Sequence, residues 1–146
     1  EPSHRLTYNV SAAGVVGTKS VSQGVAEFGG ANNEQQSDLS KFGAATGLGN
    51  LTIDKRAGPP NDPQADLTEA SLDIQYIAAT GHGNTNWVWN SKDWMFEFAS
   101  SLVVALERPS VVSVSYAWSE TEQCHGLPGA VNCSGTDNAG YVNRTN

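Results

Sequence analysis

Two carboxylates, Glu69 and Asp73, stand four residues apart in the segment 68–77, whose pattern of apolar residues predicts a helix. Because an α-helix makes one turn every 3.6 residues, both side chains lie on one face, one turn apart. Like charges at this spacing repel, so the pair loses its protons in two coupled steps and one carboxyl keeps its proton to higher pH. Such a pair can move protons at acidic pH. Most acidic pairs at this spacing are solvated helix surface, so spacing alone leaves both interpretations open.

The strands and helices that must hold this helix alternate along the chain. We expect Leu72, Ile77 and the alanines of this helix to pack it against a core. The remaining patterns predict strands at 21–28, 84–89 and 111–116, and helices at 33–42, 68–80 and 93–107. Asn33 is a candidate cap for the first of these helices, and the strand at 111–116 is expected in the sheet interior. The Gly- and Pro-rich segment 47–66 is predicted to be a loop. This order favours an α/β fold with a parallel sheet and helices on both faces.

Composition and charge limit the classes of protein. The chain has 146 residues, which is enough for one domain with its own core. Its net charge of -7 gives no electrostatic footprint for nucleic acid. No apolar run reaches the roughly 18 residues that a membrane span needs. Neither a signal peptide nor an initial Met is present, so we expect a processed or trimmed N-terminus at Glu1.

The cysteine and asparagine patterns indicate the cellular compartment in which the protein is expected. Cys124 and Cys133 lie close together in a segment rich in Gly, Pro and Asn, and a local disulfide is predicted, with two free thiols as the alternative. Four tripeptides match the N-glycosylation pattern, at Asn9, Asn50, Asn132 and Asn143. With a disulfide, these patterns favour a eukaryotic secretory or lysosomal route. No zinc site is predicted, because only one histidine stands near the cysteines.

Several segments occur in an order typical of one enzyme family. Residues 69–77 read Glu-Ala-Ser-Leu-Asp-Ile-Gln-Tyr-Ile. Further matching segments are found at 6–10, 25–28, 37–42, 86–89, 109–116 and 141–146. Together they resemble the sedolisin family of serine-carboxyl peptidases, most closely its tripeptidyl-peptidase branch. The resemblance implies a subtilisin-like fold, incomplete in this chain, with residues 1–146 as the N-terminal portion of a single peptidase domain.

The resemblance also implies a chemistry in which a glutamate replaces the histidine base of ordinary serine peptidases. Carried over to this sequence, Glu69 accepts the proton of a serine hydroxyl and later donates it to the leaving amine. Asp73 hydrogen-bonds Glu69, orients it and shares a proton with it. A carboxylate base titrates far below imidazole, so the working pH is acidic. A third, protonated carboxylic acid donates to the oxyanion.

The family's nucleophilic serine and its oxyanion acid belong to later segments, of the Gly-Thr-Ser and Ser-Gly-Asp-Ser-Gly types. The chain ends at Asn146 and contains neither segment. We therefore expect it to be inactive alone and to need a second chain or a longer parent polypeptide. The family's calcium site, near its C-terminus, is likewise expected only in the complete enzyme, and no cofactor is expected in this chain.

The substrate is expected to be a peptide or protein. By the same resemblance, Ser115, Tyr116 and Ala117 lie along it, with backbone groups of the strand pairing with the peptide. The family usually has Gly at the position of Ala117, so the added methyl group would narrow the subsites.

The leading hypothesis is an acid-active serine-carboxyl peptidase, secreted or lysosomal/vacuolar, that releases tripeptides from free amino termini. The alternative is a non-catalytic secreted binding module with a degenerate peptidase fold. Retention of both Glu69 and Asp73 argues against that alternative, because a binding module has no use for a repelling carboxylate pair. A carbohydrate-binding protein that uses Trp87, Trp89 and Trp94 is a third hypothesis.

Overall fold

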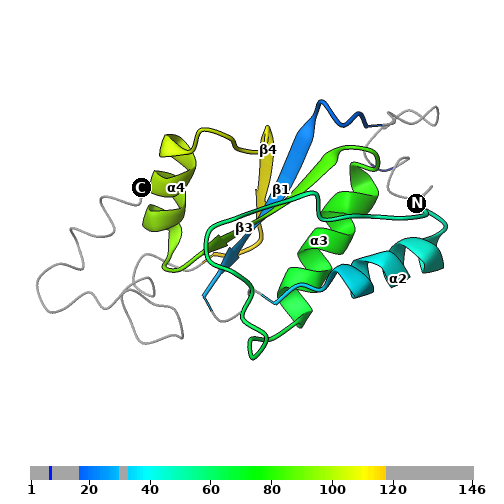
Figure 1. Cartoon of the computed structure of the whole chain (residues 1–146), viewed down its shortest axis with the longest axis horizontal. Helices are drawn as coiled ribbons and strands as arrows, with labels where there is room; N and C mark the ends of the chain where they lie inside the picture. The colour runs from blue at the N-terminus through cyan, green and yellow to red at the C-terminus, as the bar shows by residue number, and fades with distance from the viewer. Residues whose placement is uncertain (1–6, 8–16, 30–32, 118–146) are drawn as a thin grey trace, which may run out of the picture.

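Four parallel strands and three helices alternate along the part of the chain that the computed structural model describes, residues 7, 17–29 and 33–117 (Figure 1). In chain order they are β1 (Ser22–Phe28), α2 (Gln36–Thr46), β2 (Lys55–Ala57), α3 (Thr68–Thr80), β3 (Thr85–Ser91), α4 (Met95–Val104) and β4 (Val111–Val114). All strand pairs are parallel, in the spatial order β2-β3-β1-β4. The predicted α/β class, consistent with part of a subtilisin-like fold, is confirmed.

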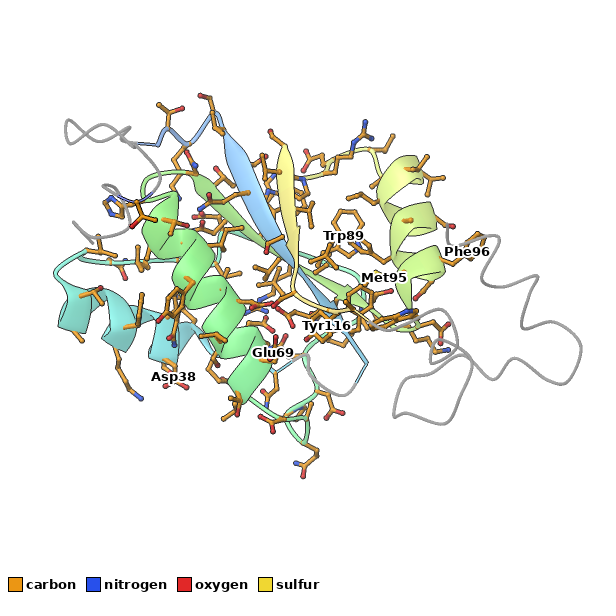
Figure 2. All side chains as sticks on the ribbon, turned by 180° about the vertical axis from the view of Figure 1, so that it is seen from behind. Asp38, Glu69, Trp89, Met95, Phe96 and Tyr116 are labelled. Atoms are coloured by element: carbon orange, nitrogen blue, oxygen red, sulfur yellow. The ribbon has the colours of Figure 1, made fainter. Side chains whose placement is uncertain are left out.

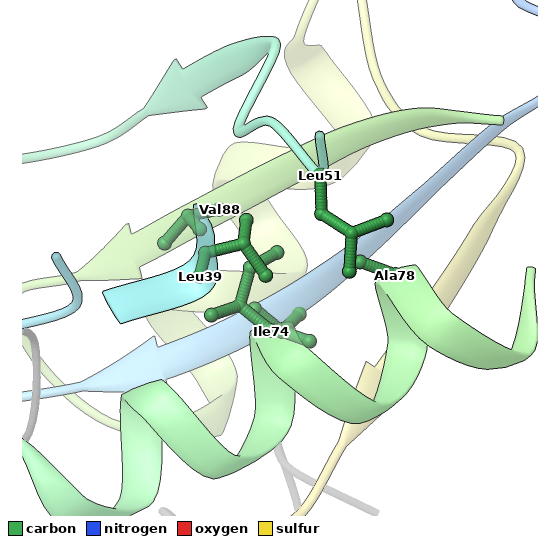
Figure 3. Packing of buried hydrophobic residues seen from close by; sticks show 6 residues of the cluster. Leu39, Leu51, Ile74, Ala78 and Val88 are labelled. Atoms are coloured by element: carbon green, nitrogen blue, oxygen red, sulfur yellow. The ribbon is translucent and has the colours of Figure 1, made fainter. Parts of the chain in front are cut away.

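Helices α2 and α3 cover one face of the sheet. Because successive side chains of a strand point to opposite faces, Val25 of β1 and Val88 of β3 meet on this side. They pack with Leu39 of α2 and Ile74 of α3 (Figure 3). Each of these side chains is at most 1% exposed, and burying one contributes about 1.5–3 kcal/mol. This contact holds α3 against the centre of the sheet.

Helix α4 covers the opposite face, and aromatic side chains fill the space between them. Phe28 of β1 lies 4.8 Å from Trp94 and 5.7 Å from Phe98, centroid to centroid. Trp89 meets Phe98 edge-on, and Trp87 stacks on Trp89 at 6.4 Å. The three tryptophans are at most 6% exposed. They are core residues and form no open sugar-binding face.

The predicted core stripe of α3 is confirmed at the alanines and at the partly buried Ile77, and is wrong at Leu72. Ala70, Ile74 and Ala78 are buried, whereas Leu72 is 47% exposed. Spacing explains the difference, because residues four apart share a face and Leu72 falls between two members of the buried row. The correct row leaves Glu69 and Asp73 on the neighbouring stripe.

Other predictions at element ends are also corrected. Strand β2 lies inside the segment that was predicted to be a loop. The sequence shows no strand pattern there, because two of its three residues, Lys55 and Arg56, are charged and exposed. Helix α2 begins at Gln36, and the Asn33 side chain binds the backbone oxygen of Ala65 (2.8 Å) instead of capping it. Within the described sheet β4 pairs with β1 alone and lies at the edge, where an interior position was predicted.

Candidate active site

Helix α3 carries the two carboxylates on a half-buried stripe beside its core stripe. The backbone N–H of Thr68 donates to Oδ1 of Asp66 over 2.6 Å, which fixes the start of the helix one residue before Glu69. Asp73 follows one turn later, next to the buried Ile74. Packing of Ile74 on the sheet therefore holds both carboxylates at the sheet.

A third carboxylate, Glu27, lies in β1, which has β3 on one side and β4 on the other. Its side chain is fully buried. Burial raises the pKa of Glu27 to about 8, the hydrogen bond from Tyr116 opposes this, and the charges of Asp73 and Glu69 add to it. Glu27 therefore holds its proton at acidic and neutral pH.

The pKa of Asp73 is also raised. Burial raises its pKa, repulsion by Glu69 adds to the rise, and a hydrogen bond from the Ser115 hydroxyl opposes it. Oδ2 of Asp73 accepts no hydrogen bond from the described residues. A proton on that oxygen would give Asp73 a donor for a neighbouring carboxylate.

The segment after β4 brings Ser115 and Tyr116 to these carboxylates. The Tyr116 hydroxyl donates to Oε2 of Glu27 over 2.7 Å, and its ring packs 5.0 Å from that of Phe28. In Figure 2 Tyr116 lies beside Met95 of α4, in keeping with its packing on the aromatic cluster between the sheet and that helix. Burial raises the pKa of Tyr116, and Glu27 adds to the rise, so the phenol remains a donor. This ring is partly buried against the aromatic cluster, whereas Ser115 and Ala117 are exposed, so these two residues and the backbone of the segment remain accessible to a peptide.

The arrangement suits proton transfer at acidic pH. Glu69 and Asp73 are coupled by charge, and the buried Glu27 behind them is neutral below about pH 8. A base works best when its pKa lies near the operating pH, and a carboxylate meets that condition in acid. Sequence reasoning found the first two residues and missed Glu27. Its signal was a single charged residue inside the apolar run Val25-Ala26-Glu27-Phe28.

The other predicted site residues fall in different places. Asn50 is exposed in the loop between α2 and β2. Cys124, Cys133, Asn9, Asn132 and Asn143 lie outside the described residues. Residues 7, 17–29 and 33–117 contain no group of three or more His, Cys, Asp or Glu side chains that could hold a metal ion. No helix in the described part is long and apolar enough to cross a bilayer.

Comparison with known proteins points to one family. The chain is similar to physarolisin from Physarum polycephalum, a sedolisin-family peptidase, with 36% identity over 121 residues. The aligned region covers 82% of this chain and 20% of physarolisin, so the chain spans about one fifth of its relative's length. No protein-family model matches the chain. The similarity supports the sedolisin family and does not distinguish its branches.

Proposed function

We propose that this chain supplies the base-bearing part of an acid-active serine-carboxyl peptidase of the sedolisin type. The observation that carries the proposal is the coupling of three carboxylates, in which Glu69 is half-buried and Asp73 and the fully buried Glu27 have raised pKa values. The similarity to physarolisin supports the same chemistry. In this proposal residues 1–146 are the N-terminal portion of one peptidase domain.

The proposed mechanism assigns each carboxylate one task. Glu69 accepts the proton of a serine hydroxyl as that oxygen attacks the peptide carbonyl, and then gives the proton to the leaving amine. Asp73 shares a proton with Glu69 and orients it. Glu27 stays neutral, so it adds no third negative charge behind the pair. The serine and a protonated oxyanion acid come from polypeptide other than residues 1–146.

Exposed apolar side chains support a contact with that further polypeptide. Val103 and Val104 of α4 are 76% and 79% exposed, and Leu106 is fully exposed. Val111 on the edge strand β4 is 61% exposed. Parallel sheets are normally covered on both faces, so this region suits burial against a further segment or a second chain. We also propose that the complete enzyme binds calcium.

Peptide is the proposed substrate, bound along residues 115–117 through backbone pairing. Release of tripeptides from free amino termini is the proposed specificity. The proposed location is secreted or lysosomal/vacuolar, with a glycan on the exposed Asn50 and a disulfide between Cys124 and Cys133.

Hydrolysis of matched peptides by the complete enzyme tests these points. A fluorogenic peptide with a free amino terminus is compared with its acetylated form between about pH 3 and pH 8, a range that spans carboxylate titration. Cleavage in acid supports the peptidase. Release of tripeptides from the free form alone supports the exopeptidase, and equal cleavage of both forms indicates an endopeptidase. No cleavage at any pH favours the non-catalytic binding module.

Mass analysis of the native material addresses the proposed second chain. Intact mass and N-terminal sequencing under non-reducing, denaturing conditions should find a companion polypeptide with Ser-Gly-Asp and Gly-Thr-Ser segments, or one longer chain that contains both. Recovery of residues 1–146 alone from active material would contradict the proposal.

A further inference from the structure

A second buried carboxylate lies outside the cluster of Glu27, Glu69 and Asp73. Glu34 follows β1, and its side chain is 0% exposed. Nη1 of Arg56, from β2, forms an ion pair with Oε1 of Glu34, while the Arg56 side chain remains 43% exposed. A carboxylate held out of water needs a charged partner, and Arg56 is the partner of Glu34.

The same ion pair holds the loop that precedes α3. Asn61 lies in this loop, and its Nδ2 donates to the backbone oxygen of Glu34 over 2.6 Å. Its Oδ1 accepts a hydrogen bond from Nη1 of Arg56 over 3.1 Å. Both ends of the Asn61 amide are therefore bound by the two residues of the ion pair.

Two more asparagines bind the ends of the loop. Nδ2 of Asn90, in β3, donates to the backbone oxygen of Pro59 over 3.0 Å. Nδ2 of Asn33 donates to the backbone oxygen of Ala65 over 2.8 Å. Gly58 has φ +77°, and a Cβ there would overlap the carbonyl oxygen of Asn90. The loop is thus bound near its start to β3, in its middle to Glu34 and Arg56, and near its end to Asn33 of the segment before α2.

The far end of this loop is the start of α3. Asp66 binds the N–H of Thr68, and Glu69 is the next residue. Asp73 is one turn further on, next to Ile74, which packs against the core. A shift of the loop would therefore displace the first turn, with Glu69, more than it would displace Asp73.

We propose that the Glu34–Arg56 ion pair positions the catalytic base. It holds Asn61, Asn61 holds the loop, and the loop sets where the first turn of α3 presents Glu69. Glu34 and Arg56 are positioning residues and act through Glu69. This inference rests on the proposed function of Glu69 as a general base.

Substitution of Arg56 and Asn61 in the complete enzyme tests the inference. Arg56→Met removes the ion pair, and Asn61→Ala removes the loop contacts without leaving a buried charge unpaired. We expect each folded variant to lose roughly tenfold to a hundredfold in kcat, because a displacement of about 1 Å can cost that much. KM should change by less than about threefold, since binding is not altered. Titration with a serine-directed inhibitor gives the concentration of active sites. Calculating kcat per active site prevents a loss of folded protein from being read as a loss of kcat.

Lys41→Met is the matched control. It breaks the exposed ion pair between Lys41 and Asp38 on α2, where Lys41 is 78% exposed, and should leave kcat and KM unchanged. A kcat within about twofold of wild type for folded Asn61→Ala and Arg56→Met would overturn the inference. So would a matching loss in Lys41→Met. If Arg56→Met does not fold, Asn61→Ala decides the question.

Glu69→Gln, measured beside these variants, separates the two proposals. If Glu69→Gln is inactive and the Arg56 and Asn61 variants are normal, only the positioning inference fails. If Glu69→Gln is active, the assignment of the base fails.

Discussion

The Tyr116 hydroxyl donates to Oε2 of Glu27 across 2.7 Å, and so joins the segment after β4 to the buried C-terminal end of β1. The residue before it, Ser115, donates to Asp73 on α3. One short segment therefore contacts two of the three coupled carboxylates. The proposed peptide-binding segment and the proposed proton-transfer site are in direct contact.

Tyr116→Phe should destabilise the protein by about 1–3 kcal/mol, because it leaves a buried carboxyl oxygen without its donor. The hydrogen bond lowers the pKa of Glu27, so it favours the ionised form. The loss should therefore be larger at about pH 9 than at about pH 5, where Glu27 is protonated. Urea denaturation at the two pH values measures both effects.

Tyr76→Phe is the control for that experiment, since Tyr76 is 57% exposed on α3. It should change stability by less than about 0.5 kcal/mol. Equal losses in the two variants would argue against the Glu27 contact.

Glu27→Gln should remove a pH dependence of stability. The pKa of Glu27 is about 8 in the folded protein and 4.5 without burial, so between these values the folded state binds more protons than the unfolded state. Stability due to this group is fully present below about pH 4.5 and is lost as pH rises to about 8, by up to about 1.4 kcal/mol per pH unit. Gln is neutral throughout, so the variant should lack this decline. Thermal unfolding between about pH 4.5 and pH 8 measures it.

Glu107→Gln provides the comparison for this slope. The Glu107 side chain is 72% exposed and pairs with Lys55. Its substitution should leave the decline between about pH 4.5 and pH 8 in place. A decline that persists in Glu27→Gln would mean that another group causes it.

Ile74→Ala should cost about 2–5 kcal/mol, because it opens a cavity between α3 and the sheet. Leu72→Ala, on the exposed side of the same helix, should cost less than about 1 kcal/mol. Chemical denaturation of both variants checks which stripe faces the core. Larger destabilisation by Leu72→Ala would contradict the observed rotation of α3 and would point Glu69 and Asp73 elsewhere.

Much of the fold was predictable because its signals are local. The apolar runs around Val25 and Val88 located the two central strands, and the pattern around Ile74 located α3. Strand β2 gave no such signal, because it has three residues and two of them are charged and exposed. The position of β4 at the edge of the described sheet follows from the strand order, which apolar composition does not encode.

The candidate site was predictable only in part, because some of its contacts join residues that are far apart in the sequence. Glu69 and Asp73 lie on one helix, so their spacing alone placed them together. Glu27 and Tyr116 are 89 positions apart and meet only because β4 pairs with β1. Likewise, Asn33 resembles a helix cap in sequence, and its true partner, Ala65, comes near only in the folded chain.

The most direct test of the central claim is the peptidase activity of the Glu69→Gln variant of the complete enzyme in acid. Gln has nearly the same shape and cannot accept the serine proton. We expect kcat/KM to fall by roughly a thousandfold or more, while circular dichroism and the unfolding temperature stay close to wild type. Wild-type activity should be confined to acidic pH. Substantial activity in Glu69→Gln, or a wild-type optimum near neutral pH, would contradict the assignment of Glu69 as the base.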